Sequence, residues 1–219
     1  MQSINTASQS SSIEINKVLK NTYMLLGMTL AWSAVCAGIS MAMNLSHLAA
    51  LVMTIVAFFL LFVVNKQADK ASGIFWIFAF TGLLGASLGP ILNVYAGLPN
   101  GGSLIMQALG GTALIFFSLS AYALTSKKDF SFMGGFLMVG LIVVLVASIA
   151  NIFFQVPAIS LATSAAIIMI MSGLILFDTS RIIHGGETNY IRATVSLYLN
   201  IYNIFVNLLQ LLGVFGGDD

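Results

Sequence analysis

The sequence predicts an all-α integral membrane protein whose chain crosses the bilayer seven times. Of its 219 residues, 59% are apolar and only 7% are charged, whereas soluble domains carry about 25% charged residues. Its mean hydropathy is +1.02, and apolar runs of about 20 residues, the length that a helix needs to cross a hydrocarbon core, recur along the chain. A soluble globule of this composition could not cover its surface with charge, so most soluble enzymes are excluded.

Each apolar run is expected to form a helix, because lipid offers no partners for an open backbone. The runs cover about Tyr23 to Met43, His47 to Asn65, Ser72 to Tyr95, Ser103 to Thr125, Phe132 to Gln155, Ala158 to Phe177 and Ile191 to Phe215. Turn-forming residues separate them. Pro90 lies inside the third run, so we expect that helix to kink or break near Gly89.

Three parts of the chain are expected: a flexible tail over residues 1–20, a transmembrane domain over 21–215, and a short C-terminus over 216–219. The first dozen residues are mostly Gln, Ser, Asn and Thr, which bury little surface and predict a mobile segment. The apolar run that begins near Tyr23 is too long for the core of an ordinary signal peptide, so we interpret it as a retained anchor.

The basic residues predict the orientation of the spans. All of them fall before the first run or in every second gap between runs: Lys17, Lys20, Lys66, Lys70, Lys127, Lys128, Arg181 and Arg192. The positive-inside rule therefore places the N-terminus in the cytosol and Asp218 and Asp219 on the outer side. No basic residue follows the last run, so the sequence leaves open whether that segment spans fully or is re-entrant.

The last run carries a stripe of polar residues. Its members recur at spacings of three and four and share an arc of about 80° over about 21 Å of helix; they are Ser196, Asn200, Asn203, Asn207 and Gln210. Such a stripe cannot face lipid. Either these side chains hold the last helix in the bundle by interhelical hydrogen bonds, or they line a hydrated path or cation site.

Asp178 ends the sixth run, and a carboxylate near a span is costly unless it has a partner. The sequence offers two possible partners for the Asp178 carboxylate. Arg181 is three residues later and would form an i,i+3 pair. Asn200 lies about two turns into the last run from the same side of the membrane and is expected at similar depth. Asp178, Asn200 and Arg181 are therefore the candidate ion- or pH-sensing residues.

Other chemistry receives little support from the sequence. A net charge of +1 offers no field for nucleic acid, and the single Cys36 cannot form a cysteine metal cluster, so we expect no metal and no cofactor. Gly85 to Gly89 match the G-x-S-x-G pattern of serine hydrolases. No histidine base lies inside a span, so close helix packing explains these small residues better than catalysis.

Several segments together resemble the Bax inhibitor family of membrane proteins, and most closely its bacterial YccA branch. The resemblance runs from about Lys17 to Gly213, and its most specific pieces are Thr81–Pro90, Tyr122–Gly135, Leu176–Thr179, Tyr190–Thr194 and Leu197–Phe205. It implies a seven-helix bundle in which the last helix is enclosed by the other six, and a location in the bacterial inner membrane.

The resemblance implies two activities. YccA-like proteins associate with the membrane-bound, ATP-dependent protease FtsH and modulate its action, whereas other members are pH-sensitive calcium leak channels gated by a pair of aspartates. Asp178 matches the first aspartate, but Asn200 occupies the second position. Two close carboxylates resist double ionisation and so respond to pH, and an Asp–Asn pair lacks that repulsion.

We therefore expect a non-catalytic partner and modulator of FtsH, and the alternative is a calcium or cation leak channel. An ATP-driven protease must engage an unstructured handle, and the tail from Gln2 to Ser12 would suit this role. The same tail is equally well explained as an ordinary disordered terminus. The expected partners are FtsH, the lipid bilayer and, in the alternative, calcium, but not nucleic acid.

Overall fold

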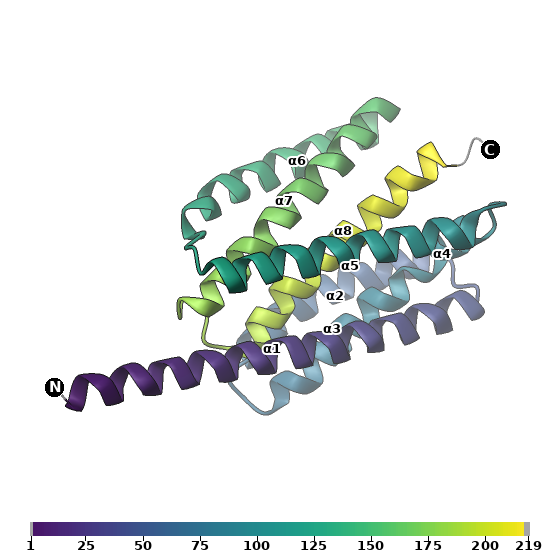
Figure 1. The fold of residues 1–219 in the computed structure, drawn as a ribbon. Coiled ribbons are helices and arrows are strands. Elements are labelled where there is room, and N and C mark those ends of the chain that lie inside the picture. The colour runs from purple at the N-terminus through teal and green to yellow at the C-terminus, as the bar shows by residue number, and fades with distance from the viewer. Residues whose placement is uncertain (1, 217–219) are drawn as a thin grey trace. The chain divides into compact units, whose positions relative to one another are not determined.

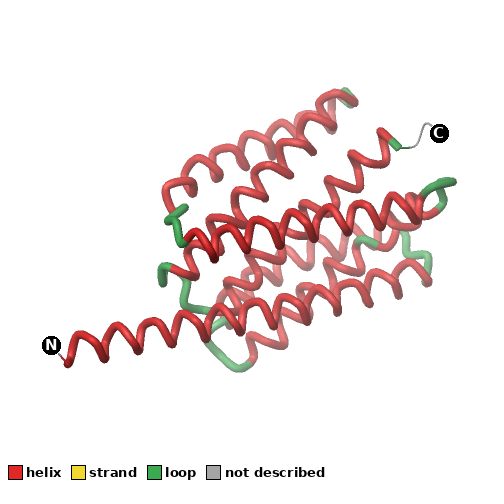
Figure 2. The backbone as a smooth tube through the Cα atoms, in the orientation of Figure 1, coloured by secondary structure: helices red, strands yellow, loops and turns green. Residues whose placement is uncertain are grey.

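The computed structural model describes the backbone of residues 2–216 and the side chains of residues 13–216. The described backbone is helical between short loops and contains no β-strand (Figures 1 and 2). Its elements are α1 (Gln2–Ala42), α2 (His47–Gln67), α3 (Ser72–Ser87), α4 (Gly89–Ala96), α5 (Gly101–Ser126), the 3-10 helix η1 (Ser131–Met133), α6 (Gly134–Phe154), α7 (Pro157–Ile183) and α8 (Tyr190–Phe215).

Within the described residues, seven helical segments are long and apolar enough to cross a membrane, which confirms the predicted number of spans. The third span, Ser72–Ala96, consists of two helices, because α3 ends at Ser87 and α4 begins at Gly89. Pro90 follows directly. The predicted break is confirmed, since proline lacks the amide proton that would continue the helix ladder.

The first span begins earlier than its apolar run. The structure places residues 2–12 in α1, a helix of 41 residues drawn in purple in Figure 1, whereas the sequence predicted a flexible tail. The side chains of Gln2 to Ser12 lie outside the described residues, and so do Asp218 and Asp219. The mobility of the tail and the outer location of the C-terminus stay predictions.

The chain forms two compact units, and α8 contributes to both. The first unit contains the residues up to Val94 together with Ile182–Tyr198. In it α3 packs against α1 and α2, and its side chains Ile77 and Phe80 are fully buried.

Glycines let α3 and α4 approach α1 closely. A Cβ added to Gly85 would overlap the backbone oxygen of Ser33, and one added to Gly89 would overlap the Ser40 hydroxyl. Bare backbone at these points permits the close helix contact that small residues typically provide in membranes. The G-x-S-x-G stretch therefore serves packing. The Ser87 hydroxyl at its centre donates to the Leu84 carbonyl at 2.7 Å.

Tyr198 fixes α8 in the first unit. Its side chain is only 1% exposed, its hydroxyl shares a 2.6 Å hydrogen bond with Ser33 of α1, and it donates to the Thr81 carbonyl of α3 at 3.2 Å. Its ring meets Phe80 edge-on, with centroids 6.0 Å apart. A buried tyrosine is stable when its hydroxyl is bonded in this way, so three helices are joined at one side chain.

The second unit contains Tyr95–Arg181 and the part of α8 from Leu199 onward. At one end of it, the Phe130 amide donates to the Ser180 hydroxyl at 3.0 Å. At the other end, Asn100 donates to the Gly216 carbonyl, and Gly213 lies against the Tyr95 ring. α8 is one uninterrupted helix of 26 residues, about 39 Å long, which is the length of a full span rather than of a re-entrant segment.

Basic residues gather at one end within each unit. In the first, Asn189 and Arg192 bind the loop that holds Lys70. In the second, Ser180, next to Arg181, donates to the Lys128 carbonyl. This distribution agrees with the charge pattern of the sequence. Which end faces the cytosol stays a prediction.

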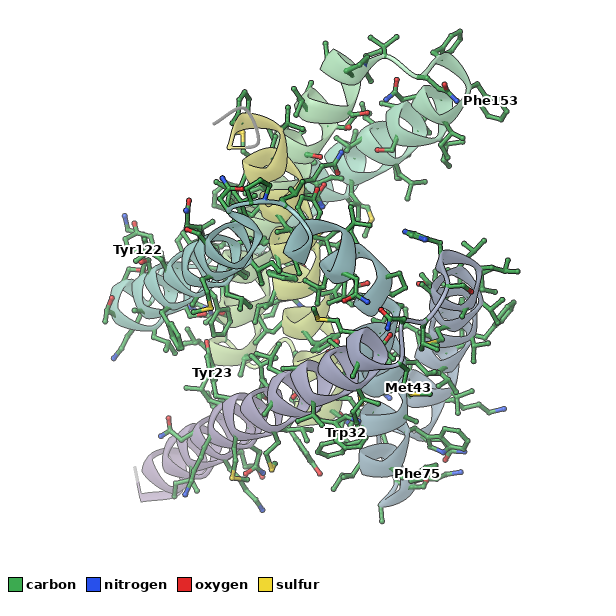
Figure 3. The ribbon with its side chains drawn as sticks, turned by 90° about the vertical axis from the view of Figure 1, so that its right-hand side faces the viewer. Tyr23, Trp32, Met43, Phe75, Tyr122 and Phe153 are labelled. Carbon is green, nitrogen blue, oxygen red and sulfur yellow. The ribbon has the colours of Figure 1, made fainter. Side chains whose placement is uncertain are left out.

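The outward surface of several spans is apolar, as lipid contact requires. Exposed aromatic rings include those of Phe59 in α2, Phe136 and Phe153 in α6, and Phe75 in α3. Figure 3 shows the labelled Phe75 and Phe153 pointing away from the helices that carry them. Such exposure would promote aggregation in water but suits a hydrocarbon environment.

Candidate functional site

Asp178 and Asn200 lie together in the interior of the second unit. The Asn200 Nδ2 atom donates to the Asp178 Oδ2 atom at 2.8 Å, which joins α7 to α8. Asp178 is 9% exposed and Asn200 is 4% exposed. A carboxylate that accepts a bond from an amide in this setting is partly compensated for its burial. A role of this pair in sensing ions or pH stays a prediction.

Arg181 is half-buried one turn after Asp178. Its guanidinium carbon lies 5.6 Å from the centre of the Phe177 ring, within the range of a cation–π contact. Thr179, next to Asp178, is fully buried, and its hydroxyl has no hydrogen-bond partner among the described residues. The polar groups at this end of α7 are thus not all satisfied by protein atoms.

Two amides of the polar stripe bond within α8 and not to another helix. Asn203 donates to the Leu199 carbonyl and Asn207 to the Asn203 carbonyl, both at 2.8 Å and both within α8. Only Asn200 forms the expected bond to another helix among the described stripe residues. The hypothesis that these amides hold α8 by interhelical bonds is therefore wrong for Asn203 and Asn207, because the nearest acceptor is their own helix backbone.

The two ends of the stripe have separate surroundings. Ser196 is half-buried and belongs to the first unit. Gln210 is half-buried in the second unit, where it lines a cavity with residues of α6 and α7. The stripe therefore runs from the Asp178 region towards this cavity. A hydrated path along α8 stays a prediction.

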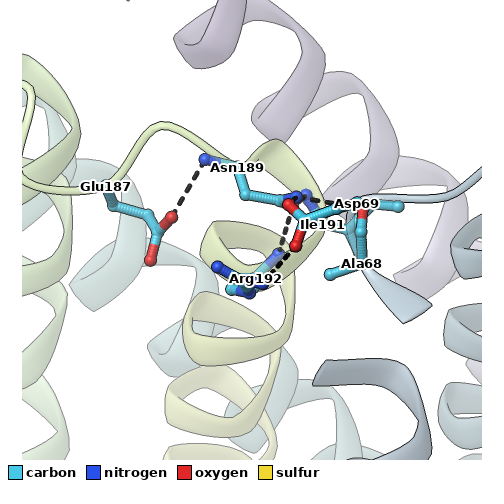
Figure 4. Close-up of polar contacts among 6 residues, drawn as sticks. All are labelled: Ala68, Asp69, Glu187, Asn189, Ile191 and Arg192. Carbon is cyan, nitrogen blue, oxygen red and sulfur yellow. Dashed lines mark hydrogen bonds and ion pairs between the residues drawn. The ribbon is translucent and has the colours of Figure 1, made fainter. Parts of the chain in front are cut away.

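One polar cluster was not predicted from the sequence, and Figure 4 shows it. Asn189 accepts bonds from the amides of Ile191 and Arg192, and its Nδ2 atom donates to the Ala68 carbonyl and to Asp69. Arg192 pairs with Asp69 as well. An Asn directly before a helical run is a typical N-cap, so the cap was detectable, whereas its contact with a loop 120 residues away was not.

Groups of three or more His, Cys, Asp or Glu that could hold a metal are absent from the described residues. The chemistry of the candidate site therefore consists of one carboxylate, the amides of α8 and the nearby guanidinium. The carboxylate and the amide oxygens can coordinate a cation. The hydrogen bond between Asp178 and Asn200 also depends on how α7 packs against α8. They contain no arrangement of nucleophile and base.

The spans and their apolar exterior define the chain as a multi-pass α-helical membrane protein. Residues 15–217 match the family described as inhibitor of apoptosis-promoting Bax1. The chain belongs to this Bax inhibitor family.

Three bacterial relatives extend the comparison over nearly the whole chain. It is 55% identical to the "Modulator of FtsH protease YccA" of Escherichia coli K12, over 96% of this chain and 95% of that protein. It is 53% identical to an uncharacterised membrane protein of Vibrio cholerae, over 98% and 96% of the two chains. It is 50% identical to an uncharacterised protein of Pseudomonas aeruginosa, over 94% and 93%.

Proposed function

We propose that this protein resides in the bacterial inner membrane, with its N-terminus in the cytosol, and that it binds and modulates the membrane-bound protease FtsH. The observation that carries the proposal is the 55% identity to the Escherichia coli modulator over almost the full length of both chains. Another relative of the same identity is named an inner membrane protein. The role is non-catalytic, and the protein acts through contact with the protease.

The N-terminal segment is the proposed handle for the protease. An ATP-driven protease pulls on a chain end that it can unfold at low cost, and residues 2–12 are rich in small polar residues that add little packing energy. Their helix in α1 does not oppose this role. A short helix of small polar residues has little intrinsic stability in water, because most helix stability in proteins comes from packing.

Deletion of Gln2 to Ser12 is expected to weaken co-purification with FtsH and to slow the turnover of this protein in cells. In the matched control, a Gly/Ser sequence of equal length replaces the same segment, so that a flexible handle is kept. We expect the replacement to retain turnover. If the deletion leaves both co-purification and turnover unchanged, the tail is not the handle.

A second candidate function is a cation leak, and the buried Asp178–Asn200 bond favours it. A carboxylate inside a membrane span is rare and is typical of ion pathways. The amides of α8 then provide polar contacts between this pair and the cavity beside Gln210. Calcium efflux from liposomes separates the two functions, because a protein that only binds a protease leaves an ion gradient intact.

A further inference from the structure

One exposed face of α5 carries a row of residues that recur at spacings of four and three. They share an arc of about 80° on the helix, and all are exposed: Ser103, Gln107, Gly110, Leu114, Phe117 and Ala121. We call this face the α5 seam. The buried residues Ala108, Thr112 and Ala123 lie on the opposite side of α5. The seam therefore points away from the packed side of its own helix.

Gln107 places a side-chain amide of the seam at the depth of the hydrocarbon core. α5 is about 39 Å long, so a centred core of about 30 Å begins about 5 Å from each end, and Gln107 lies about 9 Å from Gly101. The Gln107 Nε2 atom donates to the exposed Ser103 hydroxyl at 3.0 Å, its one side-chain hydrogen bond within the described part of the chain. The amide oxygen therefore faces lipid, where an unpaired polar group is costly.

The lipid-facing surfaces of α2 and α6 have a different composition. The exposed side chains there are mostly large and apolar, such as Phe59 and Phe62 in α2 and Val139 and Val143 in α6. Such residues are at low cost in hydrocarbon and need no protein partner. A glutamine, a serine and a glycine on one exposed face are instead typical of the surfaces through which membrane helices pack together.

Gly110 in particular has no packing role within the chain. A Cβ added to the neighbouring Gly111 would lie 3.4 Å from Leu208 of α8, whereas one added to Gly110 would meet nothing within 4 Å. A glycine inside a helix costs about 1 kcal/mol relative to alanine. That cost is offset where a second helix approaches the bare backbone closely.

The spacing of the seam and its amide favour a second copy of this chain as the partner. Alternate spacings of four and three form the seam of a coiled coil, in which one amide at a core position fixes the register. Two copies in one membrane have the same orientation, so a two-fold axis along the membrane normal sets each seam residue opposite its own copy. An amide both donates and accepts, so Gln107 is complementary to itself. A different helix would need a matching group at the same depth.

We propose that the α5 seam is a dimer interface, in which two copies of this chain pack their α5 helices in parallel. The two Gln107 amides bond to each other across the axis, and the helices approach most closely at Gly110. The α5 seam contains none of the residues used for protease modulation or for the Asp178–Asn200 pair, so the proposal does not depend on either function.

Disulfide trapping of the full-length protein in membranes tests the contact. Cys36 is first replaced with alanine, and a new cysteine is then introduced as Leu114→Cys in the seam or as Leu109→Cys, which is also exposed on α5 but lies outside the seam. Paired seams bring the two copies of position 114 within the Cα separation of about 4.4–6.8 Å that a disulfide needs. We expect a covalent dimer for Leu114→Cys and little for Leu109→Cys. Absence of the Leu114→Cys dimer, or equal cross-linking of the two, would overturn the proposal.

Energy transfer between labelled full-length copies, diluted in liposomes, measures the affinity of the dimer. Gln107→Leu is expected to weaken it about fivefold, the effect of losing one interhelical hydrogen bond, and Gly110→Leu at least tenfold, because the helices can no longer approach closely. The matched control is Gly102→Leu, at another glycine of α5 where a Cβ would meet nothing within 4 Å and which lies outside the seam.

Both glycine variants are expected to keep a melting temperature in detergent no lower than that of the parent, since neither added side chain meets another part of the chain. A loss of energy transfer in Gly110→Leu at unchanged melting temperature therefore reports the interface and not misfolding. Equal affinity in the parent, Gln107→Leu and Gly110→Leu would contradict the proposal.

Discussion

Replacement of Gly85 with leucine is expected to prevent stable packing of α1 against α3. Even a single Cβ at this position would overlap the backbone oxygen and the hydroxyl of Ser33. Backbone atoms cannot move aside as a flexible side chain does, so the helices must separate. Overpacking typically costs about 1–3 kcal/mol, and the involvement of backbone places this substitution at or above the upper end.

The matched control for this substitution is Gly38→Leu in α1. Gly38 is also a helical glycine of the first unit, but a Cβ there would meet nothing within 4 Å, so leucine would extend into open space. Thermal unfolding in detergent, followed by size-exclusion chromatography, compares the two. We expect a large loss of folded protein for Gly85→Leu and little change for Gly38→Leu. Equal stability of the two would mean that α1 and α3 are not in close contact at Gly85.

The variant Asn200→Asp is expected to introduce a pH response near neutrality. In the parent, Asn200 donates to Asp178. The Asn200 amide does not titrate, so this pair has no repulsion between two carboxylates. In the variant, two carboxylates face each other. At low pH one is protonated and donates to the other, and as the pH rises both ionise and repel. The contact between α7 and α8 is therefore stable at acidic pH and is lost as the pH increases.

Two measurements follow this variant between roughly pH 5 and pH 8, the range in which a coupled carboxylate pair responds. One is the melting temperature in detergent, and the other is calcium efflux from liposomes. We expect both to be nearly flat for the parent, whereas the variant loses stability with rising pH and, if the protein conducts, gains efflux. The double variant Asp178→Asn with Asn200→Asp exchanges the two groups, restores one carboxylate and is expected to be flat again. A flat melting profile for Asn200→Asp would contradict the argument.

The spans were predictable from the sequence because their signals are local. A run of about 20 apolar residues specifies a membrane helix by its length, and Pro90 specifies a break by its missing amide proton. The small residues around Gly85 likewise indicated close packing. Their contacts with Ser33 and Ser40 of α1 could not be predicted from the sequence.

The candidate site was predictable only in part. Helical periodicity placed the polar residues of α8 on one face, and the matching depth of Asp178 and Asn200 suggested their contact. The choice of acceptor was not predictable, because an Asn side chain reaches its own helix backbone as easily as a neighbouring helix. Asn203 and Asn207 take the first option. The bond from Asn189 to Asp69 depends on the tertiary fold, and no local pattern specifies it.

Modulation of FtsH by this chain can be measured in a reconstituted degradation assay. Purified FtsH and one of its membrane-protein substrates are placed in proteoliposomes, and the rate of substrate loss is followed as full-length protein is added. We expect the rate to change with added protein and to reach a plateau once the protease is occupied. The Gly85→Leu variant, which lacks the packed first unit, is expected to have a weaker effect. A degradation rate that stays constant even with the full-length protein in large excess would contradict the claim.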